Sequence, residues 1–389
     1  MDIFALLFIL LRPFYLRTSG QIQPSDGLLM VYFFSVVYKD ICSRKLLLNL
    51  KKNMLFYIFI ILAISINCIY LYYIPDKRFI VSSLYLVYIG VVVYSFDSGI
   101  GRPLIDKVRY VLYINILIQF VIYFTGYGKI YYESWEVGAT RYMGTFTDPN
   151  QFGFCIFITL VYAYLTKNQK IDQILFPVAS FAGIYLTIQS KSLSAILGLL
   201  TLYLLIAIRF IVSKCKVNKL LVVGSLLIIG LTASHYLIPS KDFDLSQVEY
   251  TIVNRARYKI YNIIYADGLR DILRERAAEK VINYPEYFIY GAGEGFYERY
   301  YPEPINEIHS SFINLFFSYG LIPFSILLLW FKKRLERLDG TSRICLITIM
   351  VESTFLVNYR QALFWLAWIT IFYLNEKHAN SIYSETSQT

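Results

Sequence analysis

Charged residues are scarce in this chain: they account for 16% of 389 residues, where roughly a quarter is usual in soluble proteins. Hydrophobic residues make up 57% instead. This composition excludes a soluble multidomain enzyme and a disordered chain, because both need far more polar surface. Long hydrophilic stretches are also lacking, with one exception, so no room is left for a separate globular domain of ordinary size.

Cysteine is rare as well. The chain has five cysteines, and no two of them form a C-x-x-C pair, so the sequence predicts neither a disulfide framework nor a cysteine metal site. The first twenty residues lack the basic start and the small-residue cleavage site of a signal peptide. We therefore expect them to stay as a membrane span.

Apolar runs near the length of a membrane span recur from end to end of the chain. They lie at about 3–16, 26–38, 53–74, 79–96, 108–125, 149–165, 173–189, 193–212, 220–239, 309–331, 344–357 and 362–374. The pattern predicts an all-α polytopic membrane protein with about 12 transmembrane helices.

The net charge of +10 gathers in short basic clusters between these runs. That is the distribution left by the positive-inside rule, and it argues against nucleic-acid binding. With the N-terminus inside, every short basic loop falls on the cytoplasmic side, including the strongest cluster at Lys332, Lys333, Arg334 and Arg337. Both termini are therefore predicted to be cytoplasmic.

The runs and the charges together predict how the chain is organised. We expect nine membrane helices in 1–239 with a short periplasmic loop at about 126–148, a large periplasmic loop at 240–308, three more helices in 309–374, and a cytoplasmic tail at 375–389. Part of the large loop is predicted to be helical, because its apolar residues recur at helical spacing. Arg270 and Arg274, one turn apart, would project together from that helix.

Several cations fall on the outer face in this topology. They are Arg141, Lys191, Arg270, Arg274 and Arg360. An outward cavity that is lined by cations, with His309 and carboxylates such as Glu294 and Glu307, suits a substrate that carries a diphosphate. The alternative for Lys191 and Arg360 is that each reaches toward the membrane surface without binding anything.

Other motifs have a structural and a functional interpretation. Asp148-Pro149-Asn150 is a good helix start, with a capping side chain and an early proline. His309, at a predicted membrane boundary, is either a hydrogen-bonded structural residue or a general base. The glycines of 291–296 follow no predicted strand, so they indicate a backbone turn and not a dinucleotide loop.

Four segments together resemble the O-antigen polymerase and O-antigen ligase superfamily of bacterial envelope glycosyltransferases. They are R-x-x-GTF-x-DPN-x-F-G at 141–153, the SKS turn at 190–192, GLR…YP…GAGEGF at 268–296 and HSSFINLFFSYGLIP at 309–323. The resemblance implies a GT-C-like membrane fold in the bacterial inner (cytoplasmic) membrane. It also implies inverting glycosyl transfer at the periplasmic face, with neither a metal nor a cofactor.

In this interpretation the donor is an oligosaccharide on undecaprenyl diphosphate, the five cations hold the diphosphate, and His309 is the base with Glu294 in reserve. We favour a polymerase of lipopolysaccharide repeat units, whose partner is expected to include a chain-length regulator protein in the membrane. The alternatives are an O-antigen ligase that transfers polymer to the lipid A core and, from another class, a lipid-linked oligosaccharide flippase.

Overall fold

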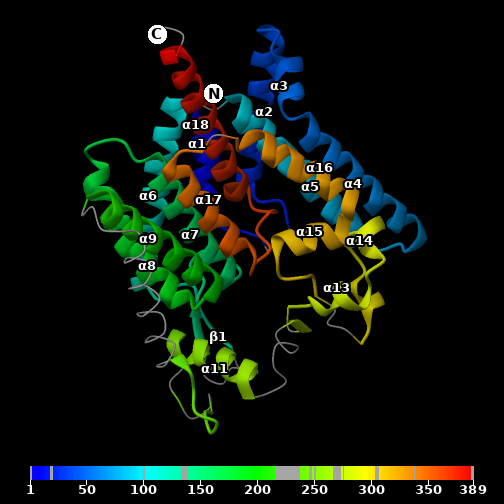
Figure 1. Cartoon of the computed structure of the whole chain (residues 1–389), viewed down its shortest axis with the longest axis vertical. Helices are drawn as coiled ribbons and strands as arrows, with labels where there is room; N and C mark the ends of the chain where they lie inside the picture. Colours follow the sequence, from blue (N-terminus) through cyan, green and yellow to red (C-terminus); the bar gives the residue numbers. More distant parts are fainter. Residues whose placement is uncertain are drawn as a thin grey trace.

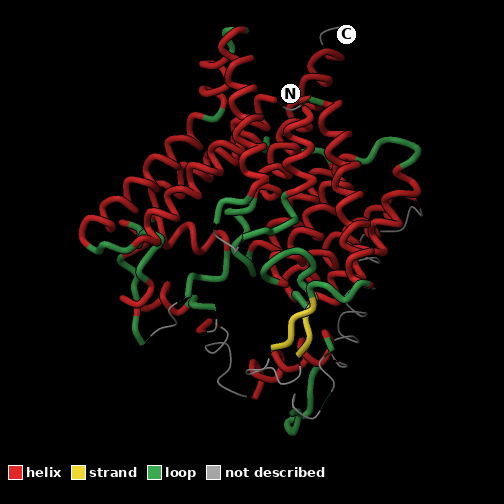
Figure 2. The backbone as a smooth tube through the Cα atoms, turned by 180° about the vertical axis from the view of Figure 1, so that it is seen from behind, coloured by secondary structure: helices red, strands yellow, loops and turns green. Residues whose placement is uncertain are grey.

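The computed structural model describes residues 2–17, 21–99, 101–132, 139–214, 237–244, 248, 251–265, 273–274, 276–302, 306–336 and 338–386. These residues are mostly helical (Figures 1 and 2). Within them, five helices are long and apolar enough to cross a membrane. The prediction of a mostly helical chain with helices that could cross a membrane is confirmed. The predicted number of about twelve spans stays a prediction.

The five long helices are α4 (Met54–Tyr73), α5 (Lys77–Gly99), α6 (Arg102–Phe124), α8 (Asp172–Ser190) and α9 (Leu193–Lys214). Their outward faces carry large apolar side chains, such as Ile61, Val121 and Phe181, which are more than half exposed. Large exposed apolar surfaces are rare on soluble monomers. We infer that these faces contact lipid.

The first apolar run forms only half a span. The helix α1 (Asp2–Leu11) has ten residues, or roughly 15 Å of rise. It ends just before Pro13, since a proline disfavours helical backbone in the residue that precedes it. The chain then runs without regular structure to α2 (Pro24–Cys42), whose first turn is closed by a hydrogen bond of 2.8 Å from the backbone N–H of Gln23 to Asp26 Oδ2.

The centre of the bundle is α7 (Pro149–Thr166), which is buried along almost its whole length. It packs against α17 (Gly340–Ser353) and α18 (Ala362–Thr386) in the middle of the molecule (Figure 1). The helix α18 continues to Thr386, through most of the segment predicted as a tail.

The predicted span at 309–331 is divided in two at Gly320. The helix α15 (Ser311–Tyr319) ends there and α16 (Leu321–Arg334) begins. Gly320 has φ +72°, and a Cβ on it would lie 2.6 Å from the backbone N of Gly291 and from the carbonyl oxygen of Ile289. Only glycine allows this conformation and this close approach. The break therefore brings a distant loop against the end of α15.

Segments of both predicted outer loops lie at one end of the molecule. This end holds the antiparallel hairpin of β1 (Lys129–Tyr132) and β2 (Ala139–Tyr142), together with the short helices of the large loop (Figures 1 and 2). Those helices are α11 (Ile252–Tyr265), α13 (Glu279–Asn283), α14 (Tyr287–Tyr290) and the 3-10 helix η2 (Tyr297–Tyr300). The start of α1, the short α3 (Leu46–Lys52) and the end of α18 lie at the opposite end.

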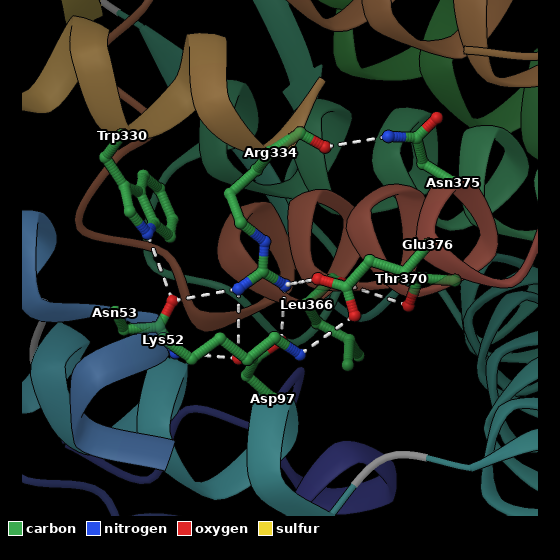
Figure 3. Close-up of polar contacts among 9 residues, drawn as sticks. All are labelled: Lys52, Asn53, Asp97, Trp330, Arg334, Leu366, Thr370, Asn375 and Glu376. Carbon is green, nitrogen blue, oxygen red and sulfur yellow. Dashed lines mark hydrogen bonds and ion pairs between the residues drawn. The ribbon is translucent and has the colours of Figure 1, made fainter. Parts of the chain in front are cut away.

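A buried charge network lies away from the outer loops and joins α3, α5, α16 and α18, with Asn53 at the junction of α3 and α4 (Figure 3). Arg334 Nη2 lies 2.7 Å from Asp97 Oδ1 and 3.1 Å from Glu376 Oε1. Asn53 donates to Asp97 Oδ2 at 2.7 Å, and Lys52 Nζ lies 3.3 Å from Asp97 Oδ1. Arg334 was counted above among the loop charges, but only 5% of its side chain is exposed. Its charge is thus paired with carboxylates of neighbouring helices.

Candidate functional site

A cavity of about 630 Å³ opens where α1 ends. Its walls come from α2, α5, the start of α7 and the segments that precede α15 and α18. Its charged lining includes Arg12, Asp26, Asp148, Glu307, His309 and Arg360. The site therefore joins residues from both ends of the chain, and it includes two of the predicted site residues, His309 and Arg360.

His309 reaches this cavity from the turn before α15. Its backbone N–H donates to the carbonyl of Arg276 at 3.0 Å, which fixes the main chain, while its imidazole makes no hydrogen bond within the described residues. Burial lowers the pKa of His309, and Glu307 nearby opposes that shift. A neutral imidazole that faces a cavity is able to accept a proton.

Arg360 is held between two carboxylates. Its Nη2 lies 2.9 Å from Glu294 Oε2 and its Nη1 lies 2.6 Å from Glu307 Oε2. Arg360 and Glu307 line the cavity, whereas Glu294 lies behind them with 1% of its side chain exposed. Burial raises the pKa of Glu294, and Arg360 opposes that rise. This geometry orients the Arg360 guanidinium toward the cavity.

The glycine-rich segment 291–296 is a turn that carries Glu294 into the protein. The backbone N–H of Gly293 donates to the carbonyl of Ser318 at 2.7 Å, and that of Glu294 donates to Asn67 Oδ1 at 2.9 Å. Tyr359 donates its hydroxyl to Glu294 Oε1. The sequence interpretation of a backbone turn agrees with this geometry.

Asp148 both caps a helix and lines the cavity. Its Oδ1 accepts from the backbone N–H of Asn150 at 2.8 Å and of Gln151 at 3.0 Å, so the predicted start of α7 is confirmed. Arg141 lies one layer behind: its Nη2 donates to Asn150 Oδ1 at 2.8 Å, and its Nε donates to the carbonyl of Ser190 at 2.9 Å. Asn150 lines the cavity, and Arg141 does not.

Two of the remaining predicted cations, Lys191 and Arg274, are not part of the described cavity lining. Lys191 caps the end of α8 in a left-handed conformation, with φ +53°, and its carbonyl accepts from Arg255. Arg274 is exposed. Arg270 lies outside the described residues. Three of the five predicted cations, Arg141, Lys191 and Arg274, are thus absent from the described lining.

The sequence reasoning missed Arg12. It lies directly after α1 and lines the cavity, and its Nε and Nη1 are buried with no hydrogen-bond partner in the described part of the chain. A signal was present, since an arginine within an apolar run of membrane length marks a functional site by default. Pro13, the next residue, further indicates that the helix breaks there.

Chemically, the cavity combines a neutral histidine, one guanidinium oriented by carboxylates and a second guanidinium without such a partner. Apolar side chains such as Met30, Leu84 and Val87 line the same space. An arrangement of this kind binds an amphiphile with an anionic head, and it places a base where a hydroxyl can reach it.

Comparison with known proteins gives one distant relative. The chain is similar to the ComP-specific O-oligosaccharyltransferase of Acinetobacter baylyi (strain ATCC 33305 / BD413 / ADP1), with 26% identity over 180 residues. The matched part is 44% of this chain and 32% of that protein, so the chain spans about a third of the relative's length. No protein-family model matches the chain. The similarity to an enzyme named an oligosaccharyltransferase agrees with the resemblance noted in the sequence, over less than half of this chain.

Proposed function

We propose that this protein transfers a glycan from a lipid diphosphate to an acceptor hydroxyl inside the cavity. The observation that carries the proposal is the joint presence of His309 and Arg360 in one lining that is partly apolar. The distant relative, itself named an oligosaccharyltransferase, supports the same class of reaction.

In the proposed reaction, the acceptor oxygen forms a bond to the anomeric carbon while the bond from that carbon to the diphosphate breaks. The electron pair leaves with the diphosphate, and the acceptor proton passes to the imidazole of His309. Arg360 stabilises the charge that develops on the leaving diphosphate. Since a diphosphate leaves without prior protonation, the proposal needs no general acid, metal or cofactor.

Glu294 suits a positioning role better than that of a reserve base. Its carboxylate is behind Arg360 and accepts hydrogen bonds from Arg360, Tyr359 and Asn314. Arg141 is similarly placed to fix Asn150. The prediction that Arg141, Lys191, Arg270 and Arg274 bind the diphosphate directly stays a prediction, and it would apply to a substrate that extends beyond the cavity.

We further propose that the protein is a polymerase, in the inner membrane, that joins undecaprenyl-diphosphate-linked repeat units at the periplasmic face. The second candidate is transfer of the oligosaccharide to a protein or to the lipid A core instead of a lipid-linked repeat unit, and the name of the relative, an oligosaccharyltransferase, is compatible with it. The two differ only in the acceptor, so the cavity chemistry is the same for both.

The test is an assay of purified protein in nanodiscs with lipid-linked repeat units as the only substrate. A ladder of chain lengths supports the polymerase. Release of lipid diphosphate that requires an added protein or lipid A core acceptor supports the second candidate. If wild-type protein releases no lipid diphosphate with any of these acceptors, glycosyl transfer is contradicted. The His309→Ala variant, which lacks the proposed base, serves as the negative control.

A further inference from the structure

The cavity contains one arginine that forms no ion pair with a described carboxylate. Arg12 Nε and Nη1 are buried and make no hydrogen bond with the described residues. Its guanidinium carbon lies 5.1 Å from the ring centre of Tyr15. A buried donor without a partner costs free energy, and at membrane depth an ionised side chain of this kind marks a binding function.

Asp26 is a carboxylate of the lining that attracts Arg12 electrostatically, but it forms no ion pair with Arg12 at contact distance, and its oxygens are held by other groups. Oδ2 accepts from the backbone N–H of Gln23 at 2.8 Å, and Oδ1 accepts from the hydroxyl of Tyr88 at 3.2 Å. Arg360, by contrast, has two carboxylate partners in the same cavity. The N–H donors at Nε and Nη1 of Arg12 are therefore available to an anion that binds in the cavity.

The backbone around Arg12 is firmly held. The N–H of Arg12 donates to the carbonyl of Phe8 at 2.8 Å, which closes the last turn of α1, and the N–H of Tyr15 donates to the carbonyl of Thr145 at 3.1 Å. Thr145 Oγ1 donates in return to the carbonyl of Pro13 at 2.6 Å. A guanidinium on such a backbone is preorganised for its ligand.

The end of α1 also explains how the protein keeps this charge without a ligand. The C-terminal end of a helix carries partial negative charge, and a cation directly beside it is stabilised. Arg12 follows Leu11, the last residue of α1. The partial negative charge of the helix end thus stabilises the cation without occupying its donors.

We propose that Arg12 binds the diphosphate of the lipid-linked substrate, through paired N–H···O bonds of the kind that guanidinium makes with phosphate. The identity of the ligand rests on the function proposed above. Because Glu294 and Glu307 already offset Arg360, a diphosphate in this cavity needs a second cation. The apolar lining from Met30, Leu84 and Val87 suits the isoprenyl chain that carries the diphosphate.

The test measures binding of undecaprenyl diphosphate to purified protein in detergent, with no acceptor present. We expect Arg12→Gln to weaken binding at least about tenfold, and Arg12→Lys to restore part of it. Arg17→Gln is the matched control, since Arg17 is exposed in the same loop, and it should bind as wild type does. Unchanged affinity in the Arg12 variants overturns the inference.

Two further arms separate the sources of phosphate. Phosphatidylglycerol and inorganic diphosphate are measured with the same variants, and an equal loss of phosphatidylglycerol binding in Arg12→Gln would mean a phospholipid site and overturn the inference. A photoreactive isoprenyl diphosphate crosslinked to the wild-type protein covers the case of unstable variants. Crosslinks in the segments that flank Arg12 or in α5 are expected, and crosslinks confined to other segments contradict it.

This design keeps the two proposals apart. Binding that depends on Arg12, in a wild-type protein that performs no glycosyl transfer, contradicts the proposed function alone. Glycosyl transfer by a protein whose binding is indifferent to Arg12 contradicts the present inference alone.

Discussion

At the scale of single residues, His309 is the sharpest test of the chemistry. Because burial lowers its pKa, His309 stays neutral to a lower pH than free histidine, whose pKa is about 6.5. A neutral imidazole is the form that accepts a proton, so we expect transfer to fall only as the pH drops below that value. The measurement is the rate of transfer by the purified protein from pH 5 to pH 8.

The amide variants distinguish the base from a structural residue. The amides of His309→Gln and His309→Asn can make a hydrogen bond in place of the imidazole, but they accept no proton at neutral pH. We therefore expect the rate to fall by about 10²–10⁴, and the fall in rate at low pH (the acidic limb of the pH profile) to disappear. Near-normal transfer by His309→Gln would remove His309 as the base.

Glu294→Gln separates positioning from proton transfer. The amide keeps the shape of the side chain but loses the ion pair with Arg360. We expect transfer about 10- to 100-fold slower, because the guanidinium is less precisely placed, with the acidic limb of the pH profile unchanged. Loss of that limb in Glu294→Gln, together with its persistence in His309→Gln, would assign the base to Glu294.

At the scale of elements, the turn at 291–296 depends on its glycines. Gly293 has φ +65°, and a Cβ on it would lie 2.9 Å from the ring of Tyr70 and 3.0 Å from that of Phe79. We expect Gly293→Ala to lower the free energy of unfolding by about 1–3 kcal/mol and to slow transfer by displacing Glu294. Thermal unfolding in detergent measures the first effect.

The control for that substitution is Gly27→Ala. Nothing lies within 4 Å of a Cβ on Gly27, and the residue is inside α2. Alanine favours a helix over glycine by about 1 kcal/mol, so this variant should unfold at the same temperature or higher. Equal destabilisation by both variants would show that the contacts of Gly293 are unimportant.

The same elements show how far sequence reasoning reaches. Asp148 and Pro149 are local signals, and they predicted the start of α7 correctly. His309 and Arg360 were found because both adjoin predicted spans on the outer face. Arg12 could have been singled out as an arginine within an apolar run, but its lack of a hydrogen-bond partner is a tertiary property that spacing along the chain does not encode.

At the scale of the whole molecule, the network around Arg334 joins four helices (Figure 3). Asp97→Asn keeps the shape of the side chain but leaves the buried Arg334 with much less compensating charge. We expect the free energy of unfolding to fall by about 3–5 kcal/mol, as measured by denaturation of the purified protein. Glu376→Gln is the matched control, since that side chain is 41% exposed and its pair should contribute little.

An equal effect of the two substitutions would contradict the difference in burial on which this prediction rests. The network also shows that a residue counted with a basic loop cluster can be buried between helices. Arg334 follows an apolar run and resembles a loop charge in the sequence, yet its partners come from the junction of α3 and α4, from α5 and from α18.

The half-length of α1 has a consequence for synthesis. Arg12 precedes every other residue of the described cavity lining along the chain, whereas Arg360 and its neighbours follow nearly all of them. Until residues 356–361 are present, the cavity around Arg12 lacks the wall that precedes α18. A nascent chain stopped before residue 354 lacks Arg360 and this part of the wall, and it should therefore be unable to retain a diphosphate lipid until these residues have been added.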